Sequence, residues 1–142
     1  MTSDLRTFEG SCHCGALGFS FQTALPVAEW SVRACQCAFC RAHGALTTSD
    51  PSGELAFQVR RDEALQRYRF GLRTADFLLC RSCGIYLGAQ LVTAQGPFGI
   101  INTRALLPLP ESLPAAVEAD YACESASDRV ARRARRWTPL SR

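Results

Sequence analysis

The chain has 142 residues, a formal net charge of +3, 47% hydrophobic residues and 20% charged residues. This length and composition are typical of a soluble globular protein, and we expect a single domain spanning 1–142. No segment approaches the roughly 18 apolar residues that a membrane-spanning helix needs. Residues 1–10 include three charged side chains and no apolar run, so we expect no secretory signal and a cytoplasmic location.

Alternating side chains predict a series of short β-strands as far as residue 102. In residues 15–22, Leu17, Phe19 and Phe21 alternate with small or polar neighbours, which indicates a half-buried strand. Further strands are expected at 29–34, 54–60, 65–70, 76–79, 85–91 and 98–102. Short strands separated by glycine-containing turns favour a mainly β fold.

The C-terminal part of the chain has a different pattern. Residues 107–114 contain three prolines and are expected to be extended. A helix is predicted from residue 114 or 115 to about 121, and a second short helix from about residue 128. In the second helix, Val130, Ala134 and Trp137 share one face at helical spacing.

Five arginines surround that apolar face: Arg129, Arg132, Arg133, Arg135 and Arg136. Such a cluster could contact the phosphates of a nucleic acid. A net charge of only +3 instead favours a solvent-exposed helix face, with Trp137 packed on the body of the protein. We therefore do not expect a nucleic-acid partner.

Seven of the eight cysteines fall into three tight groups. They are a C-x-C (Cys12, Cys14), a C-x-C-x-x-C (Cys35, Cys37, Cys40) and a C-x-x-C (Cys80, Cys83). Thiols this close in sequence are poor disulfide partners, because a disulfide needs a specific Cα separation. They are good ligands for zinc, which holds thiolates on the corners of a small tetrahedron. In a chain without a secretory signal, they indicate a reducing compartment and metal binding.

The two pairs would together make a closed four-thiolate site, which is typical of structural zinc. Gly15 and Gly84 each follow the second cysteine of a pair, where a zinc knuckle often needs a residue with positive φ. The following amide can then point at a sulfur atom. If the pairs share one metal ion, its binding free energy contributes to folding across a long loop. His13 lies between two ligands and is expected to point away from the metal.

The triplet offers three thiolates and leaves one corner of a tetrahedron free. The fourth ligand could be water, a substrate sulfur, His43 or Cys123. An open corner would give a zinc ion that acts as a Lewis acid or activates a thiolate, whereas a fourth protein ligand would give a second structural zinc. The spacing leaves both alternatives open. Taken alone, Cys123 fits a buried small hydrophobic residue, and His43 fits a polar neighbour of the site.

These motifs resemble the glutathione-dependent formaldehyde-activating enzyme family. The similar segments are 10–16 (GSCHCGA), 35–41 (CQCAFCR), 68–71 (YRFG), 77–84 (FLLCRSCG) and 101–104 (INTR). The resemblance covers a core of about 8–107 and leaves 108–142 as a C-terminal helical extension. The ordered combination of all three cysteine groups is far more specific than a lone C-x-x-C.

The resemblance implies a mainly β fold of coiled sheets, often called a β-tent. It implies two zinc ions per chain, one structural and one catalytic. Their ligands would be Cys12, Cys14, Cys80 and Cys83 for the first, and Cys35, Cys37 and Cys40 for the second. The family activity is the reversible joining of formaldehyde and glutathione to S-hydroxymethylglutathione, which is classed as a carbon–sulfur lyase reaction.

Two functions follow as hypotheses. In an enzyme, glutathione or a similar thiol would bind near the triplet, with Arg33, Arg41 and Arg104 as candidate partners of its carboxylates. His43 is the nearest histidine in sequence and is the candidate general base. Alternatively, the chain is a non-catalytic zinc module whose basic C-terminal segment contacts a partner.

Overall fold

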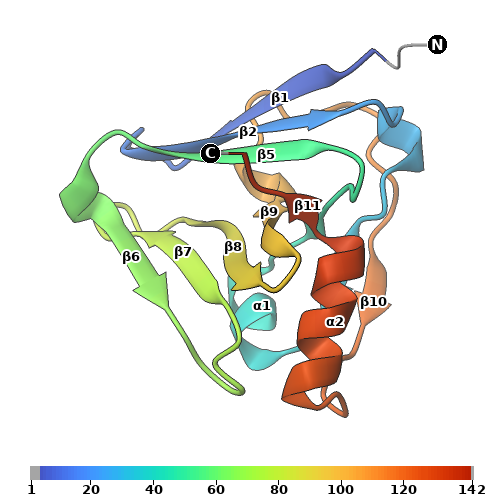
Figure 1. The fold of residues 1–142 in the computed structure, drawn as a ribbon. Helices are drawn as coiled ribbons and strands as arrows, with labels where there is room; N and C mark the ends of the chain where they lie inside the picture. The colour runs from blue at the N-terminus through green and yellow to red at the C-terminus, as the bar shows by residue number, and fades with distance from the viewer. Residues whose placement is uncertain (1–3, 142) are drawn as a thin grey trace.

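Two β-sheets build the structure, a computed structural model that describes residues 4–141 (Figure 1). The smaller sheet is antiparallel. In it, β2 (Leu17–Thr23) lies between β1 (Arg6–Ser11) and β5 (Glu54–Val59). Strands β2 and β5 each contribute alternate side chains to the space between the sheets, as the sequence pattern predicts.

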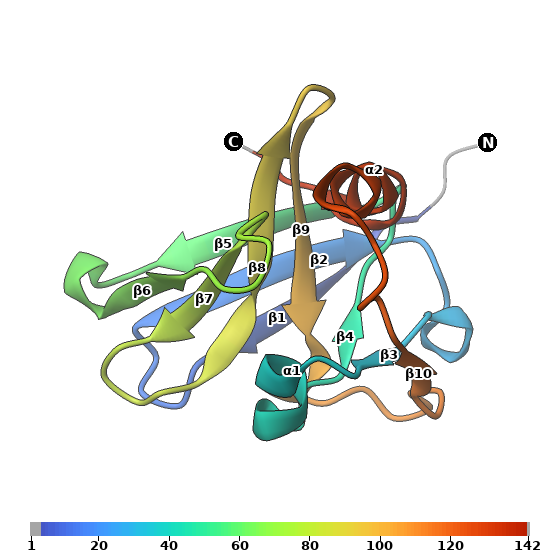
Figure 2. The same ribbon diagram turned by 90° about the horizontal axis from the view of Figure 1, so that it is seen from below.

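The larger sheet has eight strands. In spatial order they are β10 (Val117–Ala119), β3 (Arg33–Cys35), β4 (Thr47–Thr48), β9 (Gly96–Asn102), β8 (Tyr86–Thr93), β7 (Asp76–Cys80) and β6 (Leu65–Tyr68), with β11 (Thr138–Pro139) also paired to β9. All of these pairings are antiparallel except that of β10 with β3. Viewed from below, β8 and β9 run at a steep angle to the smaller sheet (Figure 2).

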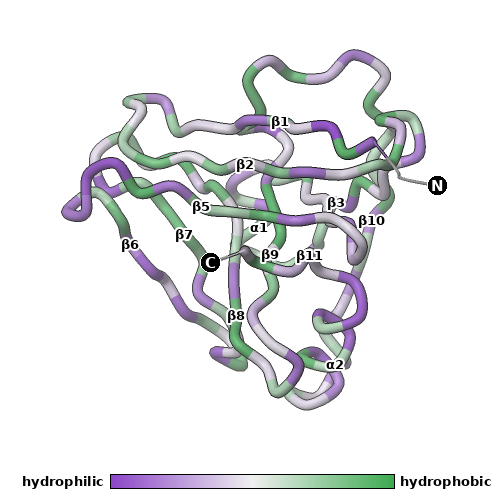
Figure 3. Tube along the Cα trace, turned by 45° about the horizontal axis from the view of Figure 1, so that its top comes forward, coloured by the Kyte–Doolittle hydropathy of each residue, from purple (hydrophilic) through white to green (hydrophobic). Residues whose placement is uncertain are grey.

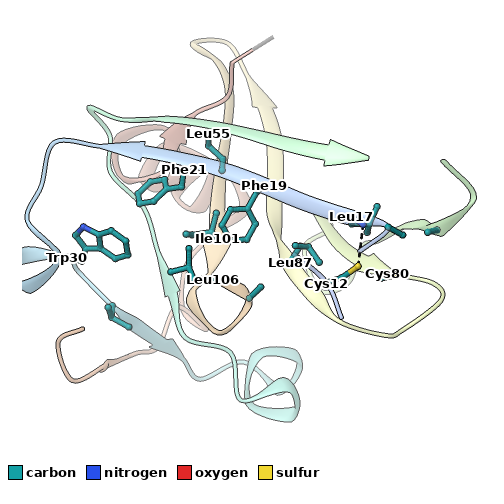
Figure 4. Packing of buried hydrophobic residues seen from close by; sticks show 14 residues of the cluster. Cys12, Leu17, Phe19, Phe21, Trp30, Leu55, Cys80, Leu87, Ile101 and Leu106 are labelled. Carbon is teal, nitrogen blue, oxygen red and sulfur yellow. Dashed lines mark hydrogen bonds between the residues drawn. The ribbon is translucent and has the colours of Figure 1, made fainter. Parts of the chain in front are cut away.

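The main core lies where the two sheets face each other (Figure 4). Phe19 and Phe21 of β2 and Leu55 of β5 meet Leu87 of β8 and Ile101 of β9, and all five are almost fully buried. Burying each such side chain contributes roughly 1.5–3 kcal/mol relative to leaving it exposed. Cys12 and Cys80 lie at one end of this cluster, so a cysteine site is continuous with the core.

Most of the predicted strands are confirmed. The pattern at 15–22 corresponds to β2, and the five predictions from 54 to 102 correspond to β5, β6, β7, β8 and β9. The strand predicted at 29–34 is shorter than expected, because a 3-10 turn at Val27–Glu29 follows Pro26 and the buried Trp30 packs on Phe21. Within 29–34, the residues that pair as a strand belong to β3, Arg33–Cys35.

The helix predicted from 114 or 115 to 121 is wrong. Its central residues form β10, whose backbone pairs in parallel with β3. The amide of Val117 donates to the carbonyl of Val32, and the amide of Gln36 donates to the carbonyl of Ala119, each at 2.9 Å. Pairing with a strand some 80 residues away in sequence therefore overrides the local preference of this segment.

Two α-helices are present among residues 4–141, α1 (Ala38–His43) and α2 (Ala126–Arg136). The second begins slightly before the predicted start, because Ser125 caps it by accepting a hydrogen bond from the amide of Asp128. Trp137 is buried against Ile100, with Val130 beside it, which confirms the predicted apolar face. Much of α2 is nonetheless hydrophilic along its trace (Figure 3).

Two further 3-10 turns, at Asp62–Ala64 and Thr103–Ala105, complete the regular structure. Within residues 4–141, no helix has the length and hydrophobicity that crossing a membrane would require.

The close approach of β8 and β9 gives a test of the fold. An added Cβ at Gly88 would collide with the backbone carbonyl of Ile100, so Gly88→Ala should lower the free energy of unfolding by about 2 kcal/mol. The control is Val92→Ala on the same strand, where the side chain is 83% exposed and the change should stay within about 0.5 kcal/mol. Urea unfolding compares the two, and equal stabilities would contradict the packing described.

Candidate metal centres and the adjoining cavity

The two cysteine pairs meet at one edge of the structure. Cys12 and Cys14 lie in the turn after β1, and Cys80 and Cys83 lie at the end of β7 and in the turn that follows. Their four sulfur atoms all lie within 4.8 Å of one another. The Sγ of Cys14 is 3.7 Å from that of Cys12 and 3.5 Å from that of Cys80. Thiolates bound to zinc at 2.3 Å would be about 3.8 Å apart, so the group fits a tetrahedral metal site.

The backbone around both pairs is arranged as zinc knuckles. Gly15 and Gly84 have φ values of 85° and 83°, as predicted. The amide of Leu17 donates to the Cys12 sulfur at 3.3 Å, and the amide of Cys83 donates to the Cys80 sulfur at 3.4 Å. Burial acts to raise the pKa of Cys83, but backbone hydrogen bonds at Ile85 and Cys14 outweigh it and lower that pKa to about 6. The turn after β7 therefore favours the thiolate form of Cys83, whereas burial raises the pKa of Cys80 to about 11.

The triplet forms a second group at the start of α1. Cys35 ends β3, Cys37 is the N-cap of α1, and Cys40 lies in its first turn. Their sulfur atoms also lie within 4.8 Å of one another. The Cys37 sulfur accepts a hydrogen bond from the amide of Cys40 at 3.4 Å. Hydrogen bonds with the thiols of Cys35 and Cys40 lower the pKa of Cys37, whereas those with Cys37 and Cys35 raise the pKa of the other two thiols. The close approach of the three sulfur atoms is what suits this group to hold a cation.

The other candidate ligands do not join the triplet. His43, at the end of α1, is exposed, and its ring packs on Phe39 with 4.5 Å between centroids. Neither His43 nor Cys123 belongs to the group of ligand atoms around the three sulfurs. Cys123 is exposed, so the expectation of a buried small hydrophobic residue is wrong; the segment before α2 keeps it on the surface. His13 is exposed and outside the four-cysteine group.

A cavity of about 160 Å³ opens beside the triplet. Residues from β3, β7, β8, β9 and α2 line it. The aromatic residues that line it are Phe70, Phe77, Tyr86, Tyr121 and Trp137, and the arginines are Arg33, Arg129, Arg132 and Arg133. Of the arginines predicted near the site, Arg33 lines the cavity. Arg41 and Arg104 are exposed and do not; Arg104 donates to the carbonyl of Gly44 instead.

Three arginines of α2 line this cavity. The sequence pattern did not predict that these side chains belong to the site. Arg132 pairs with Glu124 at 2.8 Å and stacks over Tyr121, 3.5 Å from the ring centroid. Arg129 also pairs with Glu124, at 3.3 Å, and Arg133 is buried. The expected solvent-exposed arginine face is therefore wrong, because α2 turns these side chains toward the cavity. The signal in the sequence was Glu124, a carboxylate just before the arginine-rich helix that could pair with its arginines.

The four-cysteine group predicts a large stabilisation by metal. We expect two zinc ions per chain in protein purified under reducing conditions without chelator. Cys12→Ser should lose one ion and more than about 3 kcal/mol of unfolding free energy, because binding of a structural metal is coupled to folding. Elemental analysis and thermal unfolding measure both effects. Cys123→Ser is the control, since that thiol is exposed and outside both groups; equal metal content in the two variants would contradict the assignment.

The ion pairs of Glu124 predict an acid-sensitive contribution to stability. Hydrogen bonds from Arg132, with a further one from Arg129, lower the pKa of Glu124 below its ordinary value of 4.5. The folded state then binds fewer protons than the unfolded state, so this stabilisation is present above pH 4.5 and is lost as the pH falls through the lower pKa. Glu124→Gln should cost roughly 1 kcal/mol at pH 7 and little at pH 3.

Denaturant unfolding across this pH range measures that dependence. Glu118→Gln, an exposed carboxylate on β10 with no ion pair, is the matched control and should leave the curve unchanged. A Glu124→Gln curve parallel to that of the unsubstituted protein would refute the role of the pair.

The comparisons with known proteins agree with the site. A solved Rhodobacter sphaeroides protein is 32% identical and superimposes with a TM-score of 0.59, covering 78% of this chain and 99% of its own. No protein with curated annotation matches the sequence. The family described as glutathione-dependent formaldehyde-activating enzyme matches residues 7–121, which include both cysteine groups and extend past residue 107. The chain therefore belongs to the glutathione-dependent formaldehyde-activating enzyme family.

Proposed function

We propose that this protein catalyses the reversible addition of a thiol, glutathione or a similar one, to formaldehyde or a related aldehyde. In the direction of breakdown this is a carbon–sulfur lyase reaction. The observation that supports it is the triplet itself: three thiolates gathered beside a cavity, with no fourth protein ligand among residues 4–141. Such an incomplete ligand set is typical of catalytic rather than structural zinc.

The reaction needs no oxidant or reductant. The sulfur of the thiol forms a bond to the carbonyl carbon, the carbonyl π bond breaks, and the proton of the thiol ends on the oxygen. Cys35, Cys37 and Cys40 would hold the zinc ion. When bound, zinc supplies Lewis acidity that favours the thiolate of a substrate or stabilises negative charge on oxygen.

The residues around the triplet would orient the substrate and limit water. Phe77 and the buried Tyr86 contact the cysteine cluster and form an apolar wall of the cavity. Arg33, buried and in the same cavity, is placed to bind a carboxylate of the thiol. The exposed positions of Arg41, Arg104 and His43 give no support to carboxylate binding or base catalysis by these three.

The alternative, a non-catalytic zinc module with a basic segment for a partner, gains no support. Three of the five arginines in α2 line the cavity, and two of those are paired with Glu124. Only Arg135 and Arg136 of this segment are exposed. Two exposed cations give little of the electrostatic footprint that binding to a phosphate backbone requires.

Exchange between free glutathione and S-hydroxymethylglutathione, followed by NMR, tests the proposed reaction. The zinc-loaded protein should accelerate the exchange, and Cys37→Ser should reduce the acceleration by about a hundredfold or more, because the metal site loses a ligand. Cys123→Ser keeps both cysteine groups intact and should match the unsubstituted protein. An exchange rate that no concentration of protein changes would refute this substrate assignment.

A further inference from the structure

Two buried arginines in the cavity lack a carboxylate partner among residues 4–141. Arg33 is 9% exposed and Arg133 is 8% exposed, and neither forms an ion pair in that part of the chain. Arg33 donates to the hydroxyl oxygens of Ser49 at 2.6 Å and Ser31 at 3.4 Å. Buried arginines are normally paired, because an isolated buried charge is costly.

Arg133 is the less satisfied of the two. One of its terminal nitrogens donates to the Thr74 hydroxyl at 2.7 Å, and its guanidinium lies over the Trp137 ring, 4.7 Å from the centroid. Its Nε is buried and has no hydrogen-bond partner within the part of the chain that the structure describes. Because Arg133 also lines the cavity, an anionic ligand bound there would supply an acceptor to this under-bonded guanidinium.

The charges around the cavity favour an anion. Arg129 and Arg132 share the single carboxylate of Glu124. Among the described residues, Asp120 is the carboxylate that lines the cavity, and it already accepts a hydrogen bond from the amide of Ala122 at 2.9 Å. The arginines therefore exceed the carboxylates in the cavity wall. A guanidinium fork matches a carboxylate with two parallel hydrogen bonds.

We propose that Arg33 and Arg133 bind the carboxylate of a small organic acid whose other end faces Cys35, Cys37 and Cys40. Five aromatic side chains and Ile100 also line the cavity, which suits a short apolar body. A cavity of about 150 Å³ holds a molecule the size of benzene, so this cavity of about 160 Å³ admits a small acid or one carboxylate end of a larger thiol.

This inference rests on the proposed function only where it treats the bound acid as a substrate. It also places a determinant of substrate choice in α2, which lies beyond the segment 7–121 that matches the family. The charge of the ligand would then be selected by the C-terminal extension, while the cysteine groups of the shared core perform the chemistry.

Calorimetric titration of the zinc-loaded protein with 3-mercaptopropionate and with 3-mercaptopropanol tests the site. The two probes have the same length and thiol but differ in charge. We expect the acid to bind at least about tenfold more tightly, because it alone forms charge-assisted hydrogen bonds. Arg33→Gln and Arg133→Gln should each abolish this preference. Arg135→Gln, on the same helix but exposed and outside the cavity lining, should retain it.

A readout on the unsubstituted protein covers the case in which a variant does not fold. Addition of 3-mercaptopropionate should shift the nitrogen-15 NMR signal of the Arg133 Nε–H, and 3-mercaptopropanol should not. Equal affinities for the two probes, tighter binding of inorganic phosphate than of the acid, or an unmoved Arg133 signal would overturn the proposal. A carboxylate preference without glutathione exchange would refute the proposed reaction and leave this site standing; exchange without the preference would do the reverse.

Discussion

The joining of two sheets by four thiolates is the constraint on which the rest of the structure depends. Cys12 and Cys14 follow an edge strand of the smaller sheet, whereas Cys80 and Cys83 belong to the β7–β8 turn of the larger one. Cys12 and Cys80 are also part of the main core. A metal ion held there would fix the two sheets at one end, and the aromatic core of Phe19 and Phe21 fixes them further along. The triplet and its cavity lie on the larger sheet, so their geometry depends on how the two sheets are positioned relative to each other.

Local sequence was sufficient wherever a signal lay within a few residues. The alternation in β2 and the glycines after Cys14 and Cys83 predict their conformations correctly, because residues close in sequence determine these conformations. The cysteine groups could likewise be read directly, because a short chelating motif brings its ligands together without help from the rest of the chain. The mainly β fold and the membership of the family both follow from such local signals.

The parts that sequence could not predict depend on distant partners. The segment of β10 resembled a helix, and its pairing with β3 is determined by the strand that carries Arg33 and Cys35. Arg133 looked like a surface residue, since arginine is almost never buried without a partner. Its burial depends on Thr74 and Trp137, which meet it only in the folded chain. Arg41 and Arg104 were predicted as carboxylate partners of an anionic thiol, and neither lines the cavity.

The pairing of the C-terminal residues with the body of the protein has a consequence for how the molecule assembles. The hydroxyl of Ser49 donates to the carbonyl of Arg136, and the amide of Asp50 donates to the hydroxyl of Thr138. Asp50 in turn accepts a hydrogen bond from the buried Thr23 on β2. The contacts of Ser49 and Asp50 with Arg136 and Thr138 span almost 90 residues. Long-range contacts of this kind form slowly, because the loop-closure entropy is lost before they stabilise the chain. During synthesis from the N-terminus, both cysteine groups emerge before α2 and β11 are made. Metal capture can therefore precede completion of the cavity, because the wall that α2 contributes is the last part of it to be synthesised.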